Sequence, residues 1–204
     1  MQMEYDVVII GAGLSGIGMA CQLSEKSPNK SFTILERRQA LGGTWDLFRY
    51  PGIRSDSDVI SFGFKFSPWN SNKVLASGES IKQYLQETAQ KFGVDKKVRY
   101  GIKISSANFS TQTNKWTVEA IDEANGEACQ FTCNYLVTAT GYYNHDQGYT
   151  PQFEGVENFK GQVVHPQHWP ENLDYKNKRV VVIGSGATAV TLIPAMADDT
   201  AHIT

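Results

Sequence analysis

The fold of this chain is decided by the stretch Tyr5-Asp6-Val7-Val8-Ile9-Ile10-Gly11-Ala12-Gly13-Leu14-Ser15-Gly16. Its first half is a β-branched apolar run, and a run without polar alternation is typical of a parallel strand buried on both faces. Its second half has the pattern G-x-G-x-x-G. Residues 13–26 then show the apolar face of a helix, and residues 31–36 form a second strand-like run. The sequence therefore predicts a βαβ unit that opens on a phosphate-binding turn.

Three glycines and one acidic residue indicate that this unit binds a dinucleotide. Gly11 permits the tight turn, Gly13 lets the backbone approach a pyrophosphate, and Gly16 lets helix and strand pack closely. The anion would rest on the free N–H groups at the helix N-terminus. Glu36 closes the second strand, where a carboxylate takes ribose hydroxyls and repels a 2′-phosphate. FAD or NAD is therefore expected rather than NADP, and the alternative is a turn with only a structural role.

Size, charge and cysteine content exclude several classes of protein. The chain has 204 residues, enough for one large domain or for one domain and part of another, and its 19 Lys and Arg residues nearly balance 21 Asp and Glu residues. No basic stripe indicates nucleic acid, and no apolar run approaches the roughly 20 residues that span a bilayer. The N-terminus lacks a signal-peptide pattern. The three cysteines form no C-x-x-C pair, so reduced thiols and a cytoplasmic location are expected. Membrane association stays possible but is not encoded here.

Residues 37–68 interrupt the alternation of strands and helices with a long segment rich in glycine, aromatic and charged residues. Gly42-Gly43 would allow close approach to a flat cofactor, and Trp45 and Tyr50 would offer aromatic walls. A segment of this length inside a compact domain is usually functional. The alternative is a large surface loop whose aromatic rings only cover the sheet.

The middle of the chain predicts packing elements. An i, i+3/i+4 apolar stripe between residues 77 and 93 indicates a helix that packs on the core and has no cofactor role. Residues 98–109, 116–121 and 128–135 follow as strands, and the alternation in 116–121 fits an antiparallel meander with one wet face. Residues 135–141 predict a further strand that ends in Ala-Thr-Gly.

The end of the chain repeats the opening pattern. Residues 177–183 predict a second parallel strand, and residues 184–189 have the form G-x-G-x-x-A, in which alanine still permits close packing. The helix that follows contains Pro194, which should kink it or confine it to its first turns. A new strand begins near Ala201. These residues cannot bury a core of their own, so the chain is expected to be the N-terminal part of a longer protein.

Two longer patterns carry a resemblance to a known family. Residues 159–170 read F-x-G-x-x-x-H-x-x-x-W-P, and residues 42–56 read G-G-x-W-x-x-x-x-Y-P-G-x-x-x-D. Both resemble fingerprints of the class B flavoprotein monooxygenases, which include Baeyer–Villiger enzymes and flavin-containing monooxygenases. The wider run GGTWDLFRYPGIRSDSD is similar to one branch, which contains ethionamide-activating enzymes and enzymes linked to long-chain alkane use.

The resemblance implies an α/β fold. A Rossmann-like FAD-binding domain with an antiparallel β-meander would occupy residues 1–145, a connector residues 146–170, and the start of a second Rossmann-like, NADP-binding domain residues 171–204. FAD and NADPH would be the cofactors, and O₂ and a small organic molecule (a ketone, a thioether or a hydrophobic chain) the substrates. One oxygen atom would enter the substrate through a C4a-peroxyflavin, while the protein positions the flavin and excludes water.

The resemblance also implies roles for individual residues. The adenosine diphosphate would be held by Gly11, Gly13, Ser15, Gly16 and Glu36, with Ile104 at the adenine and Thr140 and Gly141 near the pyrophosphate. The flavin side would be lined by Gly43, Thr44, Trp45, Asp46 and Leu47. Asp56 is the candidate catalytic residue, expected to orient an arginine beyond Thr204 beside the flavin, and its neighbours Arg54 and Ser55 are candidates for the nicotinamide nucleotide. The second phosphate turn comprises Gly184, Ser185, Gly186, Ala187, Thr188 and Ala189. The connector fingerprint comprises Phe159, Gly161, His165, Trp169 and Pro170, in which His165 and Trp169 would keep the moving NADP domain in register.

Other classes of protein stay open. A flavin or disulfide reductase could share both folds, but it would show a redox cysteine pair after the first helix. An alkane-associated monooxygenase is a second alternative, and a non-catalytic fragment that binds FAD partially or not at all is a third. No metal site is expected, because His165 has no second ligand at a useful spacing. The sequence predicts neither the substrate nor the oligomeric state.

Overall fold

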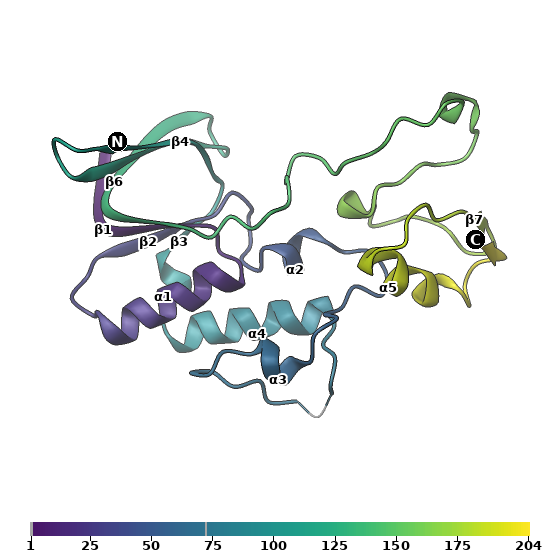
Figure 1. Ribbon diagram of the computed structural model, residues 1–204, viewed down its shortest axis with the longest axis horizontal. Coiled ribbons are helices and arrows are strands. Elements are labelled where there is room, and N and C mark those ends of the chain that lie inside the picture. The colour runs from purple at the N-terminus through teal and green to yellow at the C-terminus, as the bar shows by residue number, and fades with distance from the viewer. Residues whose placement is uncertain (1, 72) are drawn as a thin grey trace. The chain divides into compact units, whose positions relative to one another are not determined.

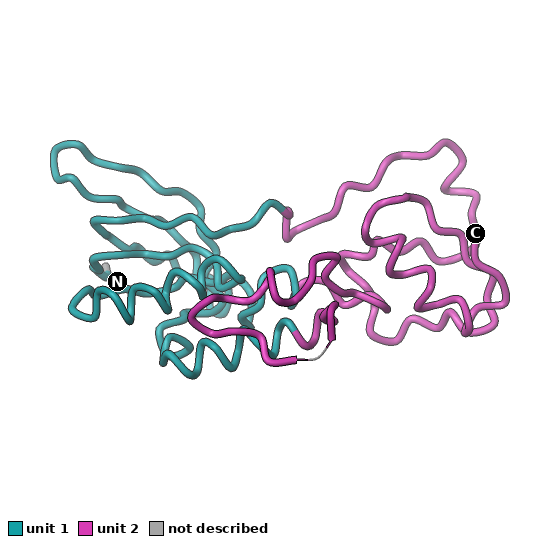
Figure 2. The backbone as a smooth tube through the Cα atoms, turned by 60° about the horizontal axis from the view of Figure 1, so that its bottom comes forward, with its two compact units in different colours: residues 1–46, 81–142 teal, residues 47–80, 143–204 magenta. Residues whose placement is uncertain are grey.

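The computed structural model describes residues 2–71 and 73–204. The chain forms two compact units, each built from two stretches of sequence (Figure 2). Unit 1 comprises residues 1–46 and 81–142, and unit 2 comprises residues 47–80 and 143–204. None of the helices among the described residues has the length and hydrophobicity needed to span a bilayer.

A six-stranded mixed sheet forms the frame of unit 1 (Figure 1). Its order is β3-β2-β1-β6-β5-β4, with parallel pairing from β3 through β6 and antiparallel pairing from β6 through β4. The strands are β1 (Gln2–Ile10), β2 (Phe32–Leu35), β3 (Val98–Arg99), β4 (Ile102–Ser110), β5 (Lys115–Asp122) and β6 (Glu127–Thr138). The predicted βαβ unit and the predicted meander are therefore confirmed as two parts of one sheet.

Buried apolar side chains explain the packing of unit 1. All four residues of β2 are buried, as expected of a strand covered on both faces. Helix α1 (Leu14–Lys26) lies against β1 and β2, and helix α4 (Gly78–Lys91) buries the predicted apolar stripe. A 3-10 turn, η1 (Asp95–Lys97), leads into β3. The apolar residues that the two helices bury include Ile17, Ala20 and Cys21 in α1 and Ile81, Leu85 and Ala89 in α4.

Two strand predictions in unit 1 were wrong in their boundaries. The strand predicted over residues 98–109 is divided at Gly101, whose φ of 74° turns the chain so that β3 pairs with β2 and β4 with β5. The strands predicted separately over residues 128–135 and 135–141 are one strand, β6. This strand is continuous because β5 pairs with its first half and β1 pairs with it from Gln130 to Thr138.

Unit 2 has less regular structure. Its helices and strands are α3 (Val59–Phe62), α5 (Ala187–Met196), β7 (Arg179–Val180) and β8 (His202–Ile203), with 3-10 turns η2 (Val156–Asn158) and η3 (Pro166–His168). Helix α2 (Thr44–Leu47) spans the boundary between the two units. Along the chain β7 precedes α5 and β8 follows it, and the two strands pair in parallel. The second predicted strand–helix–strand pattern is therefore confirmed, although its first strand is shorter than predicted.

The apolar core of unit 2 joins two distant stretches of sequence. Leu47, Phe48 and Tyr50 pack with Leu192 and Met196 of α5. These two α5 residues lie on both sides of Pro194, and the helix ends two residues after this proline, at Met196. Residues 37–68 thus contain two one-turn helices and a core contact that the sequence did not predict.

Candidate functional site

The first glycine turn, residues 11–16, has no room for side chains at its outer glycines. Gly11 has a φ of 102°, and a Cβ there would lie 2.4 Å from the carbonyl oxygen of Ala139. A Cβ on residue 16 would lie 1.9 Å from the carbonyl oxygen of Gly11. Gly13 is the N-cap of α1 and supplies no side-chain cap, so the first N–H groups of α1 face outward toward any anion. Ser15 is exposed in that first turn of α1.

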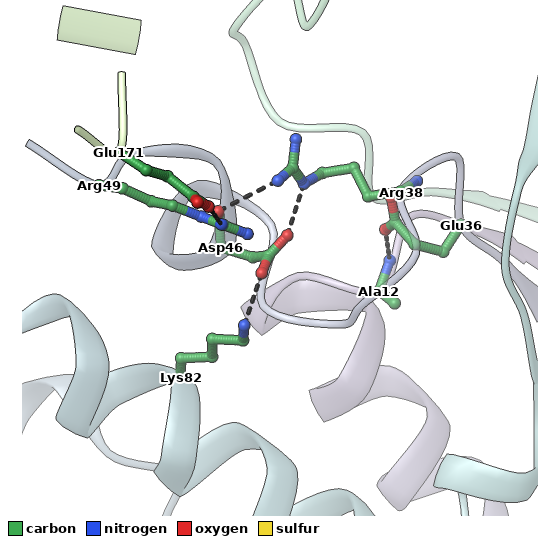
Figure 3. Close-up of polar contacts among 7 residues, drawn as sticks. All are labelled: Ala12, Glu36, Arg38, Asp46, Arg49, Lys82 and Glu171. Carbon is green, nitrogen blue, oxygen red and sulfur yellow. Dashed lines mark hydrogen bonds and ion pairs between the residues drawn. The ribbon is translucent and has the colours of Figure 1, made fainter. Parts of the chain in front are cut away.

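Glu36 closes this turn from the end of β2. Its side chain is 3% exposed, and its two carboxylate oxygens accept backbone N–H groups from Ala12 at 2.7 Å and from Arg38 at 2.8 Å (Figure 3). Each carboxylate oxygen can accept a second hydrogen bond, so Glu36 keeps capacity for ribose hydroxyls. Glu36 therefore contacts the glycine turn directly, and its predicted role at the ribose stays a prediction.

The start of the 42–56 fingerprint lies against the first glycine turn. The N–H of Gly42 donates to the carbonyl of Ala12 at 3.0 Å. A Cβ on Gly43 would lie 2.9 Å from the Cα of Gly13. Two bare backbones thus face each other, which is the surface a flat or phosphate-bearing ligand needs. Of the predicted flavin-side residues that follow, Thr44 and Trp45 are half-buried and Asp46 and Leu47 are buried.

Asp46 is engaged by two cations that the sequence did not single out. Its carboxylate lies 2.7 Å from Nε of Arg38 and 2.6 Å from Nζ of Lys82 on α4 (Figure 3). Burial alone would raise the pKa of Asp46, but the hydrogen bonds from Lys82 and Arg38 outweigh it and hold the pKa below its ordinary value. The apolar stripe that predicted α4 did not predict the contact between Lys82 and Asp46, because these two residues lie far apart in the sequence.

The Ala-Thr-Gly at the end of β6 also meets the first glycine turn. The N–H of Ala139 donates to the carbonyl of Ile10 at 2.8 Å, and the carbonyl of Ala139 crowds Gly11. Thr140 and Gly141 are exposed beyond it, and Gly141 has a φ of 70°. Ile104 is placed differently: it lies half-buried in β4, paired with Ala120, at the edge of the meander core.

Within unit 2, the second half of the 42–56 fingerprint packs on α5. Tyr50 is 5% exposed, and its hydroxyl lies 3.3 Å from Oγ1 of Thr191, so this ring belongs to the core and not to an open aromatic wall. Gly52 has a φ of 80°, and a Cβ there would lie 2.3 Å from the carbonyl oxygen of Thr191. The Tyr-Pro-Gly of the fingerprint is therefore explained by close packing on the helix.

The loop after Gly52 carries the candidate catalytic residue. Asp56 is exposed. Arg54, also exposed, forms an isolated antiparallel bridge with Ser77. Ser55 is buried between them, where its N–H donates to the carbonyl of Ala76 at 2.9 Å and its hydroxyl accepts from the N–H of Ser57 at 3.1 Å. The structure thus presents Arg54 and Asp56 to solvent from one fixed loop.

The second glycine turn, residues 184–189, is open. Gly184 and Gly186 are exposed, and no described atom lies within 4 Å of a Cβ on either of them. Gly186 is the N-cap of α5 and offers no side-chain cap, which leaves the first N–H groups of α5 available to an anion. Ser185 and Ala187 are exposed, Thr188 is half-buried, and Ala189 is buried.

The connector fingerprint owes its spacing to local packing within unit 2. The ring of Phe159 covers Gly161, where a Cβ would lie 2.4 Å from its Cζ, and the ring of His165 covers Gly148, where a Cβ would lie 2.1 Å from its Cε1. Nδ1 of His165 accepts the N–H of Gln167 at 3.2 Å.

Trp169, the tryptophan of this fingerprint, meets Tyr175 edge-on at 6.3 Å between ring centroids and packs against the unit 2 core. Pro170, half-buried, accepts the N–H of Leu173 at its carbonyl at 3.3 Å. A cavity of about 430 Å³ lies beside these rings, and Arg49 and Glu171 border it. These two exposed side chains form an ion pair at 3.5 Å (Figure 3).

Comparison with known proteins places this chain. The family described as "Pyridine nucleotide-disulphide oxidoreductase" matches residues 8–204. All of the chain is 59% identical to 42% of "Putative FAD-containing monooxygenase MymA" from Mycobacterium tuberculosis. It is 54% identical to 41% of "FAD-containing monooxygenase EthA" from Mycolicibacterium smegmatis and, likewise, to 41% of "Probable FAD-binding monooxygenase AlmA" from Acinetobacter baylyi. The chain therefore spans about two fifths of the length of the curated relatives it matches.

Solved structures agree with these relatives. An oxidized steroid monooxygenase bound to NADP matches 98% of this chain over 38% of its own, with a TM-score of 0.83 and 30% identity. Cyclohexanone monooxygenase from Rhodococcus sp. Phi1 bound to NADP⁺ matches all of this chain over 38% of its own, with a TM-score of 0.83 and 28% identity. The predicted two-dinucleotide flavoprotein fold is confirmed for the part that the chain covers. The chain belongs to the pyridine nucleotide-disulphide oxidoreductase family, and it is similar to flavoprotein monooxygenases over about two fifths of their length.

Proposed function

We propose that the complete protein is an FAD- and NADPH-dependent monooxygenase that inserts one oxygen atom from O₂ into a ketone or a heteroatom. One observation carries the proposal: Glu36 and Gly43 contact the first glycine turn, and the N-terminus of α1 that follows it has no side-chain cap. The names of the relatives and of the NADP-bound structures support it.

FAD fits unit 1 better than a cofactor with a 2′-phosphate does. The N–H groups at the start of α1 face the place of a diphosphate, and Gly11 and Gly16 leave the backbone to line it. The carboxylate of Glu36 accepts ribose hydroxyls and repels a phosphate on the same ribose. Thr44 and Trp45 follow on the flavin side. Bound flavin would supply the redox chemistry and the reaction with O₂, and the protein would orient it and exclude water.

NADPH is assigned to the second glycine turn. The first N–H groups of α5 suit a diphosphate, and Arg54 and Ser55 are assigned to the nicotinamide nucleotide. The exposed carboxylate of Asp56 is proposed to hold a cation that contacts substrate or flavin. In this assignment residues 1–145 serve FAD, apart from Arg54 and Ser55, and residues 171–204 serve NADPH. Residues 146–170 join the two parts, and His165 and Trp169 keep this connector ordered.

Disulfide reductase chemistry has no support from the cysteines. Cys21, Cys129 and Cys133 are all free thiols, and two of them are buried. Burial raises the pKa of Cys21 to about 11, which disfavours the reactive thiolate. A redox-active pair needs two thiols in bonding geometry, and none of the three described cysteines is paired.

The complete protein tests this function. Purified protein should show a flavin spectrum and should oxidise NADPH faster when its substrate is present. A ketone, a thioether and a long-chain alkane should be supplied in parallel with isotopically labelled O₂, and the product should carry one labelled oxygen. The Asp56→Ala variant should keep its FAD but yield less oxygenated product per NADPH consumed. Protein that binds flavin and labels no product, with any of the three, would overturn the monooxygenase proposal.

A further inference from the structure

A buried carboxylate with two cationic partners lies beside the first glycine turn. Asp46 is 2% exposed, and we call it together with Arg38 and Lys82 the Asp46 cluster (Figure 3). A carboxylate at this depth is costly unless it is paired. One cation would neutralise it. The second cation gives the cluster a net positive charge, so it is not needed to neutralise the carboxylate.

The Asp46 cluster is bonded to the Gly42–Gly43 turn. The N–H of Asp46 donates to the carbonyl of Gly43 at 3.1 Å, and the N–H of Trp45 donates to that of Gly42 at 3.1 Å. A Cβ on Gly42 would lie 3.3 Å from Cγ of Lys82 and 3.1 Å from Cβ of Asp46. The aliphatic stem of Lys82 therefore lies over Gly42 while its ammonium group reaches Asp46. Lys82 holds this turn by packing and by charge.

The same turn holds the dinucleotide site. Gly42 donates to Ala12, Gly43 lies against Gly13, and the N–H of Arg38 donates to Oε1 of Glu36. Contacts thus run without interruption from α4 to the two places assigned to pyrophosphate and ribose. A displacement of Lys82 would loosen the surface on which both groups rest.

We propose that Lys82, acting through Asp46, is a positioning residue for FAD. The inference rests on the proposed FAD site in unit 1 and gives α4, which the sequence predicted only as a packing helix, a part in cofactor binding. Arg38 is the second brace on the same carboxylate. The excess positive charge also favours a ligand that carries a diphosphate.

FAD affinity in the complete protein tests the proposal. Apoprotein is titrated with FAD while the quenching of flavin fluorescence is followed, for Lys82→Met, Lys82→Arg, Asp46→Asn and the Asp46→Asn/Lys82→Met double variant. Methionine keeps an unbranched side chain over Gly42 and removes the ammonium group. We expect Lys82→Met to raise Kd by about tenfold to a hundredfold, the loss of one charge-assisted hydrogen bond, and Lys82→Arg to regain most of it. Lys91→Met, which removes the same charge from the other end of α4, should leave Kd unchanged.

The double variant separates positioning from other effects. If Lys82 acts through Asp46, the double variant binds FAD no more weakly than Asp46→Asn alone. Wild-type Kd in Lys82→Met overturns the proposal, and so does an additive loss in the double variant. Urea unfolding of the apoproteins gives a second readout: if Lys82→Met apoprotein is largely unfolded under the titration conditions, Lys82 is a folding residue and the proposal fails. Wild-type protein that binds no FAD would instead contradict the proposed function.

Discussion

The two glycine turns of this chain have nearly the same sequence pattern but different surroundings. In unit 1 the turn follows a strand inside a six-stranded sheet, and neighbouring backbone lies within 3 Å of a Cβ at Gly11 or Gly16. In unit 2 the turn follows one of two paired two-residue strands, and no described atom lies within 4 Å of a Cβ at Gly184 or Gly186. The position of Gly16 is taken in unit 2 by Ala189, which is buried.

This difference shows what a glycine pattern specifies. It specifies backbone freedom and an open helix N-terminus, and both turns have these. A formed site also needs groups from elsewhere in the chain. Glu36, Gly43 and Ala139 supply them to the first turn from three separate stretches of sequence.

The largest effect is expected from exchanging the last residue of each pattern. Gly16→Ala should destabilise unit 1 by about 3 kcal/mol or more, because a Cβ there would lie 1.9 Å from the Gly11 carbonyl oxygen. The reciprocal change, Ala189→Gly, should cost only about 1 kcal/mol of helix propensity. Urea unfolding of both variants measures the two values. Equal losses would show that the two turns are packed alike.

A smaller effect is expected at Glu36, the acidic residue that contacts the first turn. Glu36→Gln places an amide group where both carboxylate oxygens now accept a backbone N–H. FAD affinity should fall by about tenfold to a hundredfold, the value of a hydrogen bond to a charged acceptor. Glu127→Gln, at an exposed position at the start of β6, is the matched control for fluorescence titration. Wild-type affinity in Glu36→Gln would remove the ribose assignment.

Acid should weaken unit 1 through Asp46. Its folded-state pKa is depressed, so its contribution to stability is complete above the unfolded value of 3.8 and is lost as the pH falls through the lower folded value. The difference in unfolding free energy between wild type and Asp46→Asn should therefore shrink as the pH falls below about 4. Denaturant unfolding at several pH values measures this difference. A difference that grows toward acid pH would contradict the ion pairs with Arg38 and Lys82.

The smallest effect is expected in unit 2. Tyr50→Phe removes a hydroxyl that lies 3.3 Å from Thr191, whose own hydroxyl also reaches the carbonyls of Ala187 and Thr188. The loss should be about 1 kcal/mol or less, and FAD affinity should not change. A clear loss of FAD affinity in this variant would indicate instead that the ring of Tyr50 contacts the flavin, as the sequence predicted.

Local patterns predicted the fold well because they reflect local physics. The strands and the first helix follow from apolar runs and periodicity, and the meander follows from alternation. The sequence did not predict the division at Gly101, because a single glycine does not reveal which neighbour each half of a strand will join. It likewise missed Lys82 and the packing of Tyr50 on α5. These contacts join residues far apart in the chain, and no period in the sequence records them.

Anaerobic reduction of the bound flavin by NADPH tests most directly whether the first turn binds FAD and the second turn binds NADPH. Ser15→Asp and Thr188→Asp put a carboxylate at matched positions in the first turns of α1 and α5, where it favours the helix but repels a phosphate. The account predicts that Ser15→Asp loses FAD. It predicts that Thr188→Asp keeps FAD and its reduction by dithionite, while reduction by NADPH slows by about tenfold or more. Loss of FAD in Thr188→Asp, or its reduction by NADPH at the wild-type rate, would contradict the assignment of FAD to unit 1 and NADPH to unit 2.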